Sequence, residues 1–301
     1  MLQKITPLIL TRNEAPNIGR TLEQLSWAED IVVVDSFSDD DTVKIVSAFP
    51  RARVFQREFD RHDRQWNFGL HDTGIRTEWV LALDADYVLT ESNLIELASL
   101  DPASITQGYR ARFTYCIHGN PLRSGIYPAV TVLYRKANAL YTQDGHTQKL
   151  LLPEHIEDLR MAIRHDDRKS LKSWFDSQAR YAELEARKLL TTMPTELSRV
   201  DRLRRWRIVA PVIVVFYCLI IRGGVLDGWA GFYYAFQRLL AELMLSLTLF
   251  EEEERAKSKG QRAKGKGQRA KSKGQRAESK GQTFEEVRAI SSATSRSLPA
   301  K

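Results

Sequence analysis

Two carboxylates, Asp84 and Asp86, end a run of apolar residues and are well placed to do chemistry. The run at 79–83 lacks polar alternation, which is typical of a strand buried on both faces of a parallel sheet. On an extended backbone, the i, i+2 spacing points both side chains the same way. Ligand sites in open α/β sheets lie at the carboxyl ends of strands. The pair therefore indicates a site for Mg²⁺ or Mn²⁺ held against substrate phosphates, although an acidic turn would show the same short pattern.

The preceding residues predict the sheet that would position this pair. Strands are expected at 5–10, 31–34 and 53–55, helices at 18–25, 42–49 and 65–73, and a fourth strand at 79–83. Strands that alternate with helices predict an α/β fold with a mostly parallel, Rossmann-like sheet and helices on both faces. A polar loop follows each strand, so we expect these loops to converge on one crevice. Asn17 is expected to cap the first helix.

The loops after the first two strands add two candidate carboxylates, Glu14 and Asp35. An ionised carboxylate only accepts hydrogen bonds, so each suits a ribose hydroxyl or a base NH. Each equally suits a helix cap or a solvated loop. Neither a dinucleotide-binding glycine fingerprint nor a glycine-lysine phosphate loop follows the first strand. Side chains are therefore expected to hold any nucleotide here.

Four motifs resemble those of family 2 glycosyltransferases and occur in that family's order, at residues 10–14, 33–42, 65–70 and 83–86. With the later motifs at 144–148 and 165–169, the chain is similar to the bacterial lipopolysaccharide core β-glucosyltransferases within that family. The resemblance covers residues 1 to about 250. It implies a GT-A fold, a nucleotide-diphosphate sugar donor, a divalent metal (Mg²⁺ or Mn²⁺) and inversion at the anomeric carbon. Its nearest subgroup implies UDP-glucose as the donor and a cell-envelope glycan or glycolipid as the acceptor.

The resemblance also implies roles for single residues. Metal ligands are expected at Asp84, at Asp86 and at His165, which we favour over His146. A carboxylate can take the proton of an acceptor hydroxyl, and this role falls to Asp144. The side chains expected to bind the donor are those of Thr11, Arg12, Glu14, Asp35, Gln65, Asn67, Asp84 and Arg168, with Lys169 beside the last of these to meet the departing pyrophosphate.

The second half of the catalytic region predicts a different strand arrangement. Residues 109–115 and 129–135 alternate like antiparallel strands, and a turn is expected at 119–121. We expect this half to form the acceptor side of the cleft. A long helix is predicted over 170–190, with an aromatic face that mostly serves packing.

Beyond the expected catalytic domain at 1–200, residues 201–250 predict a helical appendage. Four arginines precede an apolar run at 208–221 that is too short to span a membrane comfortably. The next helix, at 229–250, has an apolar face formed by Phe232, Phe236, Leu239, Leu240, Leu243 and Leu247. Basic flanks and amphipathicity favour helices that lie in an anionic membrane surface. A helical hairpin packed against protein is the alternative.

Residues 251–301 contain a basic repeat with a period of seven and are expected to form a disordered tail. Residues 255–282 carry eleven Lys or Arg and one acid, so of the formal net charge of +7 the rest of the chain contributes −3. The folded part thus lacks the basic surface of a specific nucleic-acid binder. Two cysteines without a disulfide framework and no secretory signal favour the cytoplasm, with the protein peripheral at the inner face of the cytoplasmic membrane.

Two other functions compete with a glycosyltransferase. A nucleotide-sugar nucleotidyltransferase also sets carboxylates at a sheet edge, but it normally has a glycine-rich basic loop after the first strand, where this chain has Thr11 to Glu14. A non-enzymatic adaptor could bind membrane or RNA through the tail. Deletion of residues 255–282 would distinguish them, because a transferase would largely retain its function.

Overall fold

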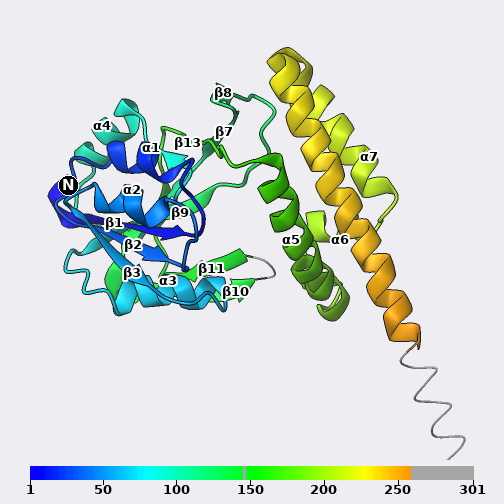
Figure 1. Cartoon of the computed structure of the whole chain (residues 1–301), viewed down its shortest axis with the longest axis horizontal. Helices are drawn as coiled ribbons and strands as arrows, with labels where there is room; N and C mark the ends of the chain where they lie inside the picture. Colours follow the sequence, from blue (N-terminus) through cyan, green and yellow to red (C-terminus); the bar gives the residue numbers. More distant parts are fainter. Residues whose placement is uncertain (145–146, 259–301) are drawn as a thin grey trace, which may run out of the picture. The chain divides into compact units, whose positions relative to one another are not determined.

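The computed structural model of the chain describes residues 1–144 and 147–258 (Figure 1). The helices are α1 (Ile18–Glu23), α2 (Thr42–Ser47), α3 (His62–His71), α4 (Glu91–Ser99), α5 (Leu171–Thr191), α6 (Arg199–Arg204) and α7 (Val209–Phe216), followed by a helix at 228–258. The strands are β1 (Ile5–Thr11), β2 (Ile31–Asp35), β3 (Ala52–Gln56), β4 (Trp79–Asp84), β5 (Tyr87–Val88), β6 (Gly108–Ala111), β7 (Phe113–Ile117), β8 (Asn120–Pro121), β9 (Val130–Arg135), β10 (Leu140–Asp144), β11 (Thr147–Leu151), β12 (Ile156–Asp158) and β13 (Ile163–His165).

The central sheet has the strand order β12-β6-β9-β4-β1-β2-β3. The strands β4, β1, β2 and β3 run parallel, while β9 runs antiparallel to both β4 and β6. The predicted α/β fold is thus confirmed, including the parallel first half and the antiparallel strand at 129–135. The sheet is mixed because β9 enters between β4 and β6 from the opposite direction.

The parallel strands contribute to two apolar cores, one on each face of the sheet, because successive side chains of a strand point to opposite faces. On one face, Ile9 and Val33 pack with Ile18 of α1 and Val46 of α2. On the other face, Leu8, Val32 and Val34 pack with Trp66 and Leu70 of α3. Figure 1 shows α1, α2 and α4 on one side of the sheet and α3 on the other. Burial on both faces explains why these strands read as unbroken apolar runs.

The predicted single strand at 109–115 is wrong, because two strands occupy this region. The strand β6 ends at Ala111 and pairs with β9 in the central sheet. The strand β7 starts at Phe113 and joins a second sheet of order β5-β13-β7-β8. The turn predicted at 119–121 lies at 118–119 in the β7–β8 hairpin, where His118 and Gly119 have positive φ angles, and Asn120 and Pro121 form β8 instead. The change of sheet brings β13 and its His165 beside β5 and the acidic pair.

The chain divides into two compact units, Met1–Thr248 and Leu249–Lys301. The helices α6 and α7, at which we expected a separate region to begin, belong to the first unit. Residues 251–258, expected to start the disordered tail, are helical. The remainder of the predicted tail lies outside the described residues, as do Gly145 and His146.

The apolar face predicted for the last helix is largely exposed in this chain. Phe232, Phe236, Leu240, Leu243 and Leu247 are 36–67% exposed. The same helix instead buries Ala230, Tyr234 and Ala235 against Ile117, Leu122 and Cys218. Within the described residues, no single helix is long and apolar enough to cross a membrane, although Val209–Ile221 and Gly224–Ser258, bent by 69°, together meet that test of length and composition.

Candidate active site

The candidate site lies where the carboxyl ends of the central parallel strands meet. Thr11 at the end of β1 is in register with Asp35 of β2, and its neighbour Leu10 is in register with Asp84 of β4. The loops that follow these strands therefore start at the same edge of the sheet, as the α/β pattern predicted. Tyr87 of β5 pairs with His165 of β13, which brings the late histidine to the Asp84–Asp86 turn.

Asp84, Asp86 and His165 form one electrostatically coupled cluster. His165 Nε2 lies 3.0 Å from Asp86 Oδ2. Burial opposes ionisation of Asp86, yet the adjacent His165 holds the pKa of this carboxyl below its ordinary value. Burial and the nearby Asp86 charge raise the pKa of Asp84 to about 6. The pKa values of the two carboxylates therefore shift in opposite directions, because His165 outweighs the effect of burial at Asp86, whereas burial and the Asp86 charge prevail at Asp84.

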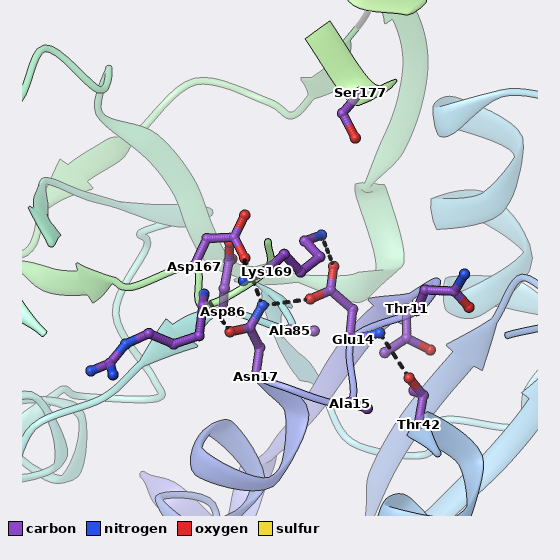
Figure 2. A network of polar contacts seen from close by, with 12 residues as sticks. Thr11, Glu14, Ala15, Asn17, Thr42, Ala85, Asp86, Asp167, Lys169 and Ser177 are labelled. Atoms are coloured by element: carbon purple, nitrogen blue, oxygen red, sulfur yellow. Dashed lines mark hydrogen bonds and ion pairs between the residues drawn. The ribbon is translucent and has the colours of Figure 1, made fainter. Parts of the chain in front are cut away.

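A second network, centred on Asn17, joins the loop after β1 to the segment after β13 (Figure 2). Asn17 Nδ2 donates to Glu14 Oε2 and to Asp167 Oδ1, both at 2.8 Å. Lys169 Nζ donates to Glu14 Oε1 at 2.6 Å. Burial, with the Asp86 charge adding to it, raises the pKa of Glu14 to about 7 against the opposing effect of Lys169. Two acids, one amide and one ammonium group are thereby fixed beside the acidic turn.

Arg168 was predicted to bind the nucleotide-sugar donor, but its side chain is held by the nearby carboxylate of Asp166. Its Nε and Nη2 donate to Asp166 Oδ1 and Oδ2 at 2.9 and 2.8 Å. Arg20 of α1 donates to the same carboxylate at 2.8 Å. Asp166 is buried, and its bonds to these guanidinium groups and to the Gly119 backbone N–H counter the effect of burial and hold its pKa below the ordinary value. The guanidinium of Arg168 therefore serves the local fold in this conformation.

Asp35 is fully buried at the end of β2. Its carboxylate accepts from Thr11 Oγ1 at 3.1 Å, from Gln56 Nε2 at 3.2 Å and from the Ser38 backbone N–H at 3.0 Å. Gln65 of α3 is also buried and donates to Ser36 Oγ at 3.0 Å. Thr11, Asp35 and Gln65 were all predicted to bind the nucleotide-sugar donor. The structure brings them together, and their hydrogen bonds shape the loop after β2.

The remaining predicted residues lie in other surroundings. Asn67 of α3 accepts from the Tyr141 N–H and donates to the Tyr141 carbonyl, both at 2.9 Å, so it joins α3 to β10. Asp144 ends β10 and forms an ion pair with Lys188 of α5 at 2.9 Å. Arg12 is exposed in the loop after β1. The structure therefore groups Glu14, Asp84, Asp86 and His165 directly, while Asp144 belongs to the separate β10–β11 hairpin.

Sequence reasoning missed the structural roles of Asn17, Asp166 and Asp167. Asn17 stands at the N-cap position of α1, but its side chain makes no capping hydrogen bond. It bonds instead to Glu14 and Asp167 and accepts from the Arg168 backbone N–H at 2.8 Å. The only signal in the sequence was the dense alternation of acid and base over 165–169. Which charge pairs with which could not be predicted, because the partners are about 150 residues apart.

The residues present fit a divalent cation in part. Asp86 Oδ1 and His165 Nδ1 are buried polar atoms without a hydrogen-bond partner among the described residues. Carboxylate oxygens are ligands that suit Mg²⁺ and Mn²⁺, and Mg²⁺ is usually bound by one or two carboxylates rather than by a complete protein cage. Within the residues that the structure describes, no group of three or more His, Cys, Asp or Glu is arranged to hold a metal. Substrate oxygens would therefore have to complete the coordination, as is usual for Mg²⁺ at phosphate sites.

Comparisons with known proteins point to a family of glycosyltransferases. The family model described as "Glycosyl transferase family 2" matches residues 8–170, more than half of the 301 residues. An uncharacterized glycosyltransferase of Rickettsia bellii is 28% identical over 146 residues, 48% of this chain and 47% of that protein. One of Rickettsia felis is 32% identical over 91 residues, 30% of this chain and 31% of that protein. The chain thus spans about half or less of the length of these curated relatives.

Solved structures match this chain at low sequence identity. S. aureus TarS 1-349, in a crystal structure in complex with UDP-GlcNAc, is 14% identical, with a TM-score of 0.47 over 83% of this chain and 92% of that chain. Glucosyl-3-phosphoglycerate synthase from Mycobacterium tuberculosis, in complex with Mn²⁺, UDP and glucosyl-3-phosphoglycerate, is 14% identical, with a TM-score of 0.40 over 61% of this chain and 78% of that chain.

The matched range of the family model contains the strands of the parallel sheet and the residues clustered at its carboxyl edge. It includes Glu14, Asp84, Asp86 and His165, which the fold brings together from both ends of that range. This chain belongs to glycosyl transferase family 2.

Proposed function

We propose that the protein is an inverting, metal-dependent glycosyltransferase that moves a sugar from a nucleoside-diphosphate donor to a hydroxyl of a cell-envelope glycan. Membership in the family supports the reaction class. One observation carries the site: at the end of β4, Asp86 and His165 each keep a buried polar atom that has no hydrogen-bond partner among the described residues, beside Asp84. Such atoms are expected where a ligand completes the site.

The side chains divide the work as follows. Asp86 and His165 would hold the cation with Asp84 beside it, and a bound cation would neutralise charge on the departing nucleoside diphosphate. Thr11, Asp35 and Gln65 shape the loop that faces the nucleoside, and Glu14 is held in place by Lys169. Asp144 would accept the proton of the acceptor hydroxyl, since single displacement needs one positioned carboxylate. UDP-glucose and a lipopolysaccharide core acceptor are proposed from the motifs at 144–148 and 165–169.

We also propose that the protein works at the inner face of the cytoplasmic membrane. Between Trp206 and Phe250, large apolar side chains are exposed on α7, on the π-helical turn Tyr217–Ile221 and on the last helix. Exposed apolar patches of this kind mark interaction sites. Arg202, Arg205 and Arg222 are exposed along the same stretch and complement an anionic surface. The occupant we infer is therefore an anionic lipid bilayer.

Binding of a nucleotide sugar tests the proposed function directly. The thermal unfolding midpoint is measured with UDP-glucose and a panel of other nucleotide sugars, each with and without Mn²⁺. A ligand that binds only the native state stabilises it by about 2.7 kcal/mol at a concentration 100 times its Kd. We expect Mn²⁺-dependent protection in the wild type and its loss in Asp86→Asn.

Asp158→Asn is the matched control, because Asp158 is an exposed carboxylate ion-paired with Arg110 on β6. It should keep the protection. The site assignment is wrong if Asp86→Asn retains Mn²⁺-dependent protection, or if none of the nucleotide sugars protects the wild type.

A further inference from the structure

We propose that a path of ion pairs positions Asp144 for catalysis, and that the helix at 228–258 thereby helps to set the base of the reaction. The path crosses from α5 through α6 to that helix, and its members are Lys188, Asp201, Arg204 and Glu242. The inference rests on the proposed function, because it names the residues that hold the base of the same site. These four are positioning residues, since they would act through Asp144.

The ion pairs run without a break from Asp144 to the last helix. Lys188 Nζ lies 2.9 Å from Asp144 Oδ1 and 3.5 Å from Asp201 Oδ2. Arg204 Nη1 lies 3.8 Å from Asp201 Oδ1, and Arg204 Nη2 lies 3.0 Å from Glu242 Oε1. Each member of the path thus has an opposite charge beside it. Loss of the charge at Glu242 would therefore change how Asp201 shares Lys188 with Asp144.

The middle and the far end of this path are shielded from solvent. Asp201 and Glu242 are only 7% and 6% exposed, so salt screens their ion pairs less than pairs on the surface. Burial opposes the charge of Lys188, yet its hydrogen bond to Asp144 and the other nearby carboxylates raise its pKa above the ordinary value. Buried ion pairs add little stability compared with apolar side chains of similar volume. We therefore attribute a directional role to these charges.

Asp144 depends on such a support because its strand stands apart from the central sheet. The strand β10 pairs with β11 in a separate two-stranded sheet, and Asp144 is its last residue. Earlier in the same strand, two hydrogen bonds at 2.9 Å join Tyr141 to Asn67 of α3. The side chain of Asp144 is 49% exposed and meets the ammonium group of Lys188. Asn67 thus holds the strand, while Lys188 helps to set the direction of the carboxylate.

The far end of the path belongs to a helix that is itself fixed to the catalytic part. Asp227, which precedes this helix, accepts from the backbone N–H of Ser124 at 3.0 Å and from its hydroxyl at 2.7 Å. The hydroxyl of Tyr234 accepts from the Ile126 N–H at 3.1 Å. Glu242 lies about two turns beyond Tyr234 on the same helix. The path therefore ends on a firm support, which makes Glu242 able to hold the side chains that lead to Asp144.

Hydrolysis of the nucleotide sugar tests the inference on the full-length protein without any acceptor. Release of the nucleoside diphosphate is measured with Mn²⁺ and the nucleotide sugar that best protects the wild type, starting with UDP-glucose. Glu242→Gln keeps the size of the side chain and removes its charge. We expect kcat to fall about tenfold, less than the about 10²-fold cost of a 1 Å misplacement, with KM for the nucleotide sugar unchanged.

A double variant shows whether Glu242 acts along the path. In Lys188→Gln the path to Asp144 is already broken, so adding Glu242→Gln should change kcat by no more than about twofold, whereas independent sites would multiply their losses. Circular dichroism verifies folding. If Glu242→Gln fails to fold, Arg204→Gln breaks the same link and carries the same expectation.

Ser246→Ala is the matched control. Ser246 is 6% exposed, lies one turn after Glu242 on the same helix and donates to the Arg207 carbonyl at 2.8 Å. The substitution removes a contact of this helix without changing any charge of the path. It should lower the midpoint of denaturant unfolding and leave kcat at the wild-type value.

Three results would overturn the positioning role and leave the proposed function standing. They are a wild-type kcat in folded Glu242→Gln, a further large loss when Glu242→Gln is added to Lys188→Gln, and an equal loss of kcat in Ser246→Ala. A wild type that neither releases nucleoside diphosphate nor is protected by any nucleotide sugar would overturn the proposed function itself, and the positioning role with it.

Discussion

At the residue scale, the proposed base and its ion-pair partner can be separated experimentally. Asp144 pairs with Lys188, and its side chain is 49% exposed, so the ion pair itself contributes little stability. We expect Asp144→Asn to keep donor affinity and to lower turnover by about 10²–10⁴, the range of general acid–base catalysis. Donor affinity and turnover are measured on the same purified variant.

Lys188→Gln is the control for this prediction because it breaks the same ion pair and leaves the carboxylate. It should turn over far faster than Asp144→Asn. If turnover fell equally in the two variants, Asp144 would be a structural residue of the hairpin. Normal turnover in Asp144→Asn would shift attention to Asp167, the carboxylate that Asn17 holds beside Glu14.

Glu14 should make stability depend on pH. Burial raises its pKa to about 7 from the ordinary 4.5, despite its ion pair with Lys169 and with Asp86 nearby. Between these two values the native state binds more protons than the unfolded state, so the free energy of unfolding falls as pH rises through the window. In Glu14→Gln this contribution is absent.

The measurement is denaturant unfolding of both proteins with a chelator present, from about pH 5 to about pH 8. Other titrating groups are common to the two proteins, so the difference between their unfolding free energies isolates Glu14. Relative to the variant, the wild type should lose stability as pH rises. A difference that stays constant over this range would show that Glu14 ionises normally.

At the element scale, Asn67 attaches the β10–β11 hairpin to α3. Its side chain bonds both the N–H and the carbonyl of Tyr141 at 2.9 Å, and Tyr141 itself is buried against Trp66. Asn67→Ala leaves two backbone groups without these partners, at about 1–3 kcal/mol for each buried group. We expect a lower free energy of unfolding by denaturant, together with reduced turnover because Asp144 lies on this hairpin.

His71→Ala is the control on the same helix, since His71 is exposed at the end of α3. It should change the free energy of unfolding by no more than about 0.5 kcal/mol, as for most surface substitutions. If Asn67→Ala is as stable and as active as His71→Ala, the hairpin is positioned by its apolar contacts alone.

At the scale of the whole molecule, the exposed apolar face should determine where the protein resides. We expect cosedimentation with liposomes that contain anionic lipid, and weaker binding at high salt because part of the attraction is electrostatic. Phe236→Glu and Leu247→Glu, at positions 54% and 67% exposed, should reduce the bound fraction strongly.

Ile95→Glu provides the control, because Ile95 is 65% exposed on α4, outside the proposed membrane face. It should bind liposomes like the wild type. The wild type could instead stay in the supernatant and form a dimer in light scattering. If Leu247→Glu converts that dimer to a monomer, the apolar face is an interface between copies of this chain.

The sequence by itself determined the α/β fold, because short apolar runs that alternate with helical segments are typical of a parallel sheet buried on both faces. It also determined the position of the Asp84–Asp86 pair at the end of β4, since that depends on local spacing. The periodicity of the apolar residues likewise predicted the antiparallel strand at 129–135 and the helix over 170–190.

Only the tertiary structure decided the division of 109–115 between two sheets, because both strands alternate alike and differ only in their distant partners. It also decided that Asn17 links Glu14 to Asp167, a contact across 150 positions. It turned the apolar side of the last helix outward, since Tyr234 and Ala235 on the other side match the surface of β7 and α7. Periodicity shows that a helix has two faces, but which face is buried depends on the shape and charge of a surface assembled from remote residues.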